Sequence, residues 1–293
     1  MTVTDPNTWH IGVIGGTGLA GGIELDEAQE IEVASAFGQS SGPVRTGILA
    51  GLRFTFIARH GAGHAIPPGD VNYRANIDVL KRCGVTDVLA LSAIGSLREE
   101  LPPGHYVAVD QFIDCTQSRS NSFFGPGLVG HVSMSDPVCP RLANLAAAAV
   151  RASGGTVHEK GCYVAIEGPQ FSTRAESRMY RAWGGDVIGM TAMPEARLAR
   201  EAELPYALLG MVTDWDSWRD GEAGVDAAQI LAVIAANVAL AHETVRAFAA
   251  ALPEVREASP IDRTLDHAII TDRAQWPPQL LAQLGAVAGR VLK

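Results

Sequence analysis

The chain has 293 residues, of which 47% are hydrophobic and 19% are charged, and its 23 basic and 32 acidic residues give a net charge of -9 at pH 7. This balance argues against nucleic acid or an anionic membrane as a partner, and it requires any bound phosphate to be held by a local pocket. Four separated cysteines without a CxxC pair argue against a disulfide framework or a zinc site. The N-terminus lacks the features of a secretory signal and no apolar run reaches the roughly 18 residues of a membrane span, so we expect a cytoplasmic protein.

The first feature along the chain is the glycine-rich segment GVIGGTGLAGG at residues 12–22, which contains a GxGxxG pattern. This pattern binds dinucleotides only where a helix follows the glycine turn. The acidic stretch 23–30 has no helical apolar spacing, and an extended run is expected from Ile31, so too little chain is left for a crossover helix. We therefore expect no nicotinamide cofactor. The backbone amides and the Thr17 hydroxyl can instead bind a small anion, although a turn that only reverses the chain also fits.

Short apolar, β-branched runs alternate with helical patterns through the rest of the chain. Strands are predicted at residues 11–15, 44–51, 52–58, 86–93, 105–113, 161–168, 186–190 and 206–214. Helices are predicted at residues 71–84, 139–155, 173–185, 193–204 and from about 226 to 252. This alternation predicts a single-domain three-layer α/β/α sandwich with a mixed, twisted sheet. Its core spans about residues 10–252, and a C-terminal appendage at 253–293 packs on the body or on a neighbouring subunit.

Four polar clusters stand where predicted strands end, and open α/β sheets bind ligands at such ends. They are the glycine turn with Thr17, the segment with Arg59 and His60, the small residues around Ser92, and the segment with Met190 and Thr191. A fixed guanidinium suits bidentate capture of an anion, and we expect His60 to add a donor. Hydroxyls, amides and one guanidinium without a P-loop lysine predict a pocket for inorganic phosphate. Taken singly, each cluster also fits a plain loop, turn or N-cap, and His64 is most simply a loop residue.

The sharpest signal is the segment MVTDWDSW, in which a predicted strand ends at Asp214 and Asp216 between tryptophans. Two positions apart on an extended chain, the acids share a face. Two carboxylates in apolar surroundings cannot both ionise cheaply, so one is expected to keep its proton near neutral pH. A protonated carboxyl can donate to N7 of a 6-aminopurine while the neighbouring carboxylate accepts from its exocyclic amine. A 6-oxopurine presents two acceptors at the same edge and fits this pair less well. A surface acid pair or a metal site are the alternatives, although no histidine neighbours the pair.

Seven motifs in this order resemble those of the 5'-methylthioadenosine phosphorylases, in the trimeric branch of the purine nucleoside phosphorylase family: GVIGGTGL, ARHG with PPGDVNYRANI, SAIGSLRE, DQFIDCT, IEGPQFSTRAES, GMTAMPE and TDWDSW. The resemblance covers roughly Ile11 to Leu252. It implies the phosphorylase/hydrolase-like fold of the nucleoside phosphorylases and a homotrimer. It also implies reversible phosphorolysis of 5'-methylthioadenosine to adenine and 5-methylthioribose 1-phosphate, with inorganic phosphate as co-substrate and no metal or organic cofactor.

The resemblance assigns roles to individual residues. The phosphate pocket maps onto Thr17, Arg59, His60, Ser92, Ala93 and Thr191. Met190 would lie by the ribose, Phe171 would flank the purine plane, and the adenine edge would be read by Ser172, Asp214 and Asp216, with Asp214 as the acid at N7. The 5' pocket would combine a histidine from the neighbouring subunit with residues near the start of the last long helix: His131, Val225, Ala227, Ile230 and Leu231.

Three positions depart from the family pattern. Gln170 replaces the usual arginine of GPRF, Ala227 stands where valine is common, and Ile94 replaces a cysteine. These changes leave the phosphorolysis residues in place but leave the 5' substituent open. The alternatives are therefore a phosphorylase for another 5'-deoxy-5'-substituted adenosine, such as a 5'-fluoro or 5'-chloro compound, or a broader purine nucleoside phosphorylase. A nucleoside-binding protein without activity is a further alternative, against which the complete acid pair argues.

Overall fold

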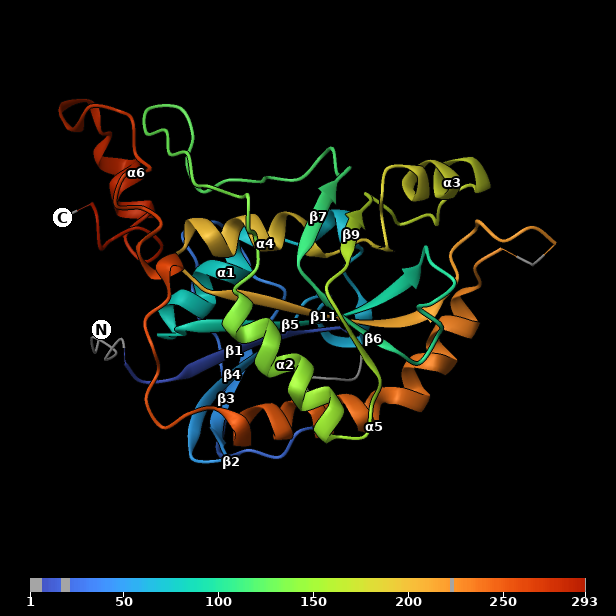
Figure 1. The fold of residues 1–293 in the computed structure, drawn as a ribbon. Helices are drawn as coiled ribbons and strands as arrows, with labels where there is room; N and C mark the ends of the chain where they lie inside the picture. Colours follow the sequence, from blue (N-terminus) through green and yellow to red (C-terminus); the bar gives the residue numbers. More distant parts are fainter. Residues whose placement is uncertain (1–6, 17–21, 222–223, 293) are drawn as a thin grey trace.

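The structure is a computed structural model that describes residues 7–16, 22–221 and 224–292. These residues form one mixed 11-stranded sheet with helices on both faces, which confirms the predicted three-layer α/β/α sandwich (Figure 1). The strands are β1 (His10–Gly15), β2 (Asp26–Ile31), β3 (Val44–Leu49), β4 (Leu52–Ala58), β5 (Asp87–Ser96), β6 (Tyr106–Val109), β7 (Gln111–Asp114), β8 (Val157–Glu159), β9 (Cys162–Ala165), β10 (Val187–Gly189) and β11 (Tyr206–Asp214).

The helices divide between the two faces of the sheet. They are α1 (Tyr73–Arg82), α2 (Pro140–Ala152), α3 (Arg174–Ala182), α4 (Ala192–Glu201), α5 (Ala227–Ala251) and α6 (Pro278–Gln283). Helices α1 and α4 lie on one face of the sheet, and α2 and α5 lie on the other (Figure 1). Apolar side chains of each pair contribute to a separate hydrophobic core. The apolar spacing that predicted these helices in the sequence is thus the spacing that buries one side of each against the sheet.

The acidic stretch after the glycine turn forms a strand that the sequence did not predict. All six side chains of β2 are exposed, and the strand lies at the sheet edge, antiparallel to β3. Its backbone hydrogen bonds, rather than apolar burial, hold it there. The expected extended run from Ile31 was therefore wrong, because the strand ends at that residue.

A change of pairing partner along the central strand β5 creates the space for a site. The first half of β5 pairs in parallel with β1 as far as the Ile14–Ala90 pair, and its last residues pair with β10 at Gly95 and Ser96. Between these two pairings no strand among the described residues pairs with β5 on that side, while β11 continues along its other side. The end of β1, the end of β10 and the middle of β5 therefore surround one opening in the sheet.

The C-terminal appendage packs on the body of its own chain, which is one of the two predicted alternatives. Leu284 and Val287 join the buried core beside α1 and α4. The Glu203 carboxylate accepts hydrogen bonds from the backbone amide of Leu265 (2.9 Å) and from Nε of Arg290 (2.8 Å). Apolar contacts and an ion pair together fasten the appendage.

Helix α5 is long and apolar enough to cross a membrane by length and composition alone, although polar residues such as Gln229 and Asn237 interrupt its apolar stretch as the sequence analysis expected. Its second half packs on the sheet through the buried side chains of Val245 and Phe248. One such helix is weak evidence for a membrane span, because the core helices of other proteins meet the same criterion.

Candidate active site

The opening beside β5 leads into a cavity of about 720 Å³. Its walls bring together predicted residues from all along the chain: Arg59, His60, Ser92, Ala93, Phe171, Ser172, Met190, Thr191, Asp214, Asp216, Ala227, Ile230 and Leu231. Val225 and His131 do not line it, and Thr17 lies outside the described residues. The predicted anion-binding and purine-reading residues thus share one cavity.

His131 is exposed on the same chain, in a segment paired with the appendage by the Gly130–Ile269 bridge. The backbone amide of His131 donates to the carbonyl of Ala268 (2.8 Å). Its expected contribution to the cavity of a neighbouring subunit stays a prediction.

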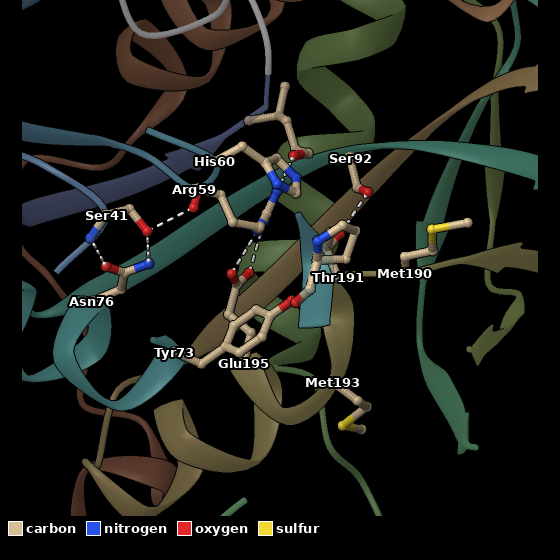
Figure 2. A network of polar contacts seen from close by, with 12 residues as sticks. Ser41, Arg59, His60, Tyr73, Asn76, Ser92, Met190, Thr191, Met193 and Glu195 are labelled. Carbon is tan, nitrogen blue, oxygen red and sulfur yellow. Dashed lines mark hydrogen bonds and ion pairs between the residues drawn. The ribbon is translucent and has the colours of Figure 1, made fainter. Parts of the chain in front are cut away.

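Arg59 forms an ion pair with a carboxylate that the sequence analysis did not single out. Its Nε and Nη2 donate to the two oxygens of Glu195 at 2.7 and 2.8 Å, and both side chains are only 1% exposed (Figure 2). Nη1 donates to the Leu91 carbonyl (3.2 Å). Burial alone would lower the pKa of Arg59, but the Glu195 charge outweighs it and raises the pKa, so the guanidinium stays charged. Bidentate pairing fixes its plane and leaves further N–H groups for an anion in the cavity.

The backbone of Arg59 is fixed as well. The Ser41 hydroxyl donates to the Arg59 carbonyl (2.6 Å) and accepts from the amide of Asn76 in α1 (2.9 Å), whose oxygen in turn accepts from the Ser41 backbone (2.8 Å) (Figure 2). Asn76 is thereby a buried amide with every polar atom engaged, and it ties α1 to the end of β4.

His60 presents a different group from the expected one. Its Nδ1 lies 2.9 Å from the Ile66 carbonyl, which can only accept, so Nδ1 carries the proton of the neutral ring. Burial, reinforced by the charge of Arg59, lowers the pKa of His60 to about 4. The neutral ring therefore offers Nε2 as an acceptor, whereas the sequence analysis expected a donor, and the role of His60 toward an anion stays a prediction. His64, expected to be only a loop residue, lines the cavity and stacks on His60 with ring centroids 4.1 Å apart.

Two hydroxyls face each other across the opening in the sheet. Ser92 Oγ, on β5, lies 3.0 Å from Thr191 Oγ1, at the end of β10 (Figure 2). Thr191 is the N-cap residue of α4 by position, but its side chain makes no capping bond. Thr191 therefore does not act as a side-chain cap of α4. Its hydroxyl and that of Ser92 are available to a ligand.

The acid pair also lines the cavity, and a turn brings its members together. The strand ends at Asp214, and Asp216 has a positive φ of 50°, so the two do not share a face of an extended strand as expected. Instead the Asp216 backbone amide donates to Oδ1 of Asp214 (2.8 Å), while the Thr213 hydroxyl donates to Oδ2 (2.7 Å). Burial raises the pKa of both carboxyls. The expectation requires this direction, and a proton held by one of the acids near neutral pH stays a prediction.

The glycine of the SAIGS motif makes room for this pair. A Cβ on Gly95 would lie 2.9 Å from Oδ1 of Asp214 and 3.4 Å from Cβ of Asp216. Any larger residue would have to displace the carboxylate, so β5 can approach the acids closely only because this position carries no side chain.

Next to the acid pair, two buried oxygens are ready for a ligand. Oδ2 of Asp216 and the hydroxyl of Ser172 form no hydrogen bond of good geometry within the described part of the chain. The hydroxyls of Ser172 and Ser177 nevertheless lie close enough to the Asp216 carboxylate to oppose the rise of its pKa. Both residues line the cavity, and the neighbouring Phe171 presents a ring that is 40% exposed. Buried polar atoms need well-aligned partners, so these oxygens and the exposed ring fit a ligand with a polar edge and a flat face.

The remaining wall is apolar and comes from the first turns of α5. Ala227, Ile230 and Leu231 line it together with Ile234, which the sequence analysis did not name. Ile234 follows Ile230 by four residues and so lies on the same helix face, which is the signal that could have identified it.

These groups define a cavity lined by a cation, two hydroxyls, a pair of half-buried acids and an apolar wall. Among the residues described, no group of three or more His, Cys, Asp or Glu side chains could hold a metal ion. The arrangement can orient an anion below a bound molecule while a proton or hydrogen bond is supplied to that molecule's polar edge.

Residues 10–250 match the phosphorylase superfamily, and the chain belongs to this family. Among its relatives, the S-methyl-5'-thioadenosine phosphorylase of Cereibacter sphaeroides is 52% identical over 285 residues, which cover 97% of this chain and 98% of that protein. A methylthioadenosine phosphorylase from an antarctic soil metagenomic library has a similar structure, with a TM-score of 0.88, 39% identity and coverage of 96% of this chain and 99% of that one. A mutant adenosine/methylthioadenosine phosphorylase from Schistosoma mansoni, solved with methylthioadenosine, matches with a TM-score of 0.76, 35% identity and coverage of 83% and 91%.

Proposed function

We propose that the chain catalyses the reversible phosphorolysis of 5'-methylthioadenosine to adenine and 5-methylthioribose 1-phosphate. The observation that carries the proposal is that one cavity is lined both by the fixed Arg59 guanidinium and by the half-buried acids Asp214 and Asp216. The names of the relatives support the methylthio substrate over a 5'-fluoro or 5'-chloro adenosine.

The acid pair acts on the purine. As the glycosidic bond loosens, negative charge grows on the base, and it is relieved by a proton or strong hydrogen bond at N7. Asp214, with its pKa raised by burial, supplies this proton, and Asp216 accepts from the exocyclic amine. Ser172 completes the contacts to the purine edge, and Phe171 covers its plane. A positioned general acid of this kind contributes about 10²- to 10⁴-fold to the rate.

The anion end acts on the sugar. Arg59, Ser92 and Thr191 hold phosphate below the anomeric carbon, where positive charge develops, with Thr17 and the amide of Ala93 as further ligands. Because Glu195 fixes the guanidinium in advance, little reorganisation is needed when phosphate binds. The neutral His60 accepts a hydrogen bond from a P–OH group, which leaves the unprotonated phosphate oxygens for the attack. Met190 lies by the ribose hydroxyls.

The reaction needs inorganic phosphate as co-substrate and no metal or organic cofactor. The proposal includes a cytoplasmic homotrimer in which His131 and Val225 complete the 5' pocket of the active sites. The exposure of Phe171 (40%) and Leu231 (55%) at the cavity rim supports a neighbouring subunit that covers them. Oligomeric state is measurable by sedimentation.

The test is release of free base from a panel of nucleosides at saturating phosphate. The panel contains 5'-methylthio-, 5'-chloro- and 5'-fluoro-5'-deoxyadenosine, adenosine, and 5'-methylthioinosine as the 6-oxo control. The proposal predicts the highest kcat/KM for 5'-methylthioadenosine and a large loss for 5'-methylthioinosine, because the 6-oxo group cannot donate to Asp216. Equal rates for the 6-amino and 6-oxo compounds would contradict the role of the acid pair.

A further inference from the structure

Arg119 is a buried cation that does not line the cavity and that the phosphorolysis mechanism does not use. It lies in the loop after β7, its side chain is only 1% exposed, and its Nε pairs with the Glu167 carboxylate at 3.1 Å. Its guanidinium carbon lies 5.4 Å from the centre of the Tyr73 ring, and Nη1 reaches the Tyr73 hydroxyl at 3.1 Å. A fully buried guanidinium must satisfy its donors within the protein, so its partners show what it holds.

The partners are mainly backbone carbonyls. Nη1 donates to the carbonyls of Met190 and Met193, both at 2.6 Å. Nη2 donates to the carbonyl of Glu167 at 2.7 Å and to that of Ile166 at 3.3 Å. One planar group therefore links the chain after β9, the chain after β10 and the first turn of α4.

Each linked segment carries a different part of the cavity. The chain after Glu167 leads to Phe171 and Ser172, which face the purine end. Met190 lines the cavity and precedes Thr191 at the anion end. Met193 stands two residues before Glu195, the carboxylate that fixes Arg59.

We infer that Arg119 is a positioning residue that sets the distance between the purine-binding and phosphate-binding ends of the cavity. The inference rests on the proposed function and adds to it a residue that touches neither substrate. A shift of about 1 Å between reacting groups costs on the order of 10²-fold in rate. The set of hydrogen bonds from Arg119 to the carbonyls of Glu167, Met190 and Met193, called the brace below, is therefore expected to affect catalysis as well as stability.

The planar fork is essential to this role. Lysine keeps the positive charge, but its single nitrogen cannot reach carbonyls on both sides as the two η nitrogens do. Arg119→Lys therefore retains the charge and loosens the brace.

The chain offers a matched control in Arg256, whose side chain is 2% exposed. Arg256 pairs with Asp87 and Asp262, fastens the appendage and does not line the cavity. Arg256→Lys makes the same chemical change in an equally buried site. Thermal unfolding, kcat, and KM for phosphate and for 5'-methylthioadenosine are measured for wild type and both variants.

We expect Arg119→Lys to lower kcat/KM by about tenfold or more and to raise KM for phosphate. Arg256→Lys, at a similar or larger loss of thermal stability, is expected to keep kcat and both KM values within about twofold of wild type. Kinetics that fall equally in the two variants, or a change in stability alone, would overturn the inference.

Glu167→Gln is a second variant, since it weakens the hold on Arg119 without changing the buried guanidinium. A several-fold fall in kcat/KM is expected, and wild-type kinetics would contradict the inference even if Arg119→Lys failed to fold. The proposed function is tested separately by the wild type, because absence of phosphate-dependent adenine release there would refute the activity and not the brace.

Discussion

The buried pair of Arg59 and Glu195 makes a quantitative prediction about both stability and phosphate binding. Glu195→Gln keeps the shape of the side chain but removes the charge that two guanidinium nitrogens contact at 2.7 and 2.8 Å. Oε1 also accepts the Tyr206 hydroxyl at 2.9 Å, so the substitution disturbs a second buried donor.

The magnitude follows from burial. Both partners of the pair are 1% exposed, and removal of one charge from such a pair costs about 3 to 5 kcal/mol, because the other charge is left uncompensated away from water. In a large domain about 2 °C of melting temperature is lost for each kcal/mol, so we expect a decrease of roughly 6 to 10 °C.

The assay is thermal unfolding with and without inorganic phosphate, and the control is Glu159→Gln. Glu159 pairs with Arg151 on the surface at 2.7 Å, and both side chains are at least half exposed. Such exposed pairs contribute less than about 1 kcal/mol to stability. Phosphate should raise the melting temperature of the Glu195 variant more than that of wild type, because the bound anion then replaces the missing charge beside Arg59. Equal melting temperatures for the two variants would refute this reasoning.

Three further predictions concern protons. Asp214→Asn should lower kcat by at least about 100-fold while phosphate still binds in calorimetry, and a near-normal kcat would remove the acid from the mechanism. The His60 imidazole should titrate by NMR at a pKa of about 4, and at a higher pKa once phosphate is bound. Because the ring titrates near 6.5 in the unfolded chain, the free energy of unfolding should fall by roughly 3 kcal/mol as the pH is lowered from 6.5 to 4. A His60 ring that is already charged at pH 6 would contradict this prediction. Burial raises the pKa of Glu201 from 4.5 to about 7, so its contribution to the free energy of unfolding is lost as the pH rises across that range. Glu201→Gln should remove this decrease of the unfolding free energy with pH. An unchanged pH dependence in the variant would contradict the prediction.

The elements that the sequence predicts best are those in which burial and pattern coincide. The apolar run of β5 and the one-sided face of α1 are examples, since the packing of each depends on side chains that are close in the sequence. β2 was missed because its exposed acidic side chains carry no strand pattern and only pairing with β3 defines it.

The residue set of the cavity could be predicted because short motifs at strand ends mark it. The contacts that tune these residues could not. Glu195 lies 136 positions from Arg59, and the tautomer of His60 is set by the carbonyl of Ile66, which any residue would supply at that place. Arg119 gives no signal in the sequence either, because its partners are mainly carbonyls.

The central claim is that phosphate, and not water, cleaves the glycosidic bond of a 6-aminopurine nucleoside in this cavity. The most direct measurement is adenine release from 5'-methylthioadenosine with and without phosphate, with the sugar product identified by mass spectrometry. We predict release only in the presence of phosphate, with one 5-methylthioribose 1-phosphate formed for each adenine. Adenine release without phosphate and with free 5-methylthioribose, or no release under either condition, would contradict it.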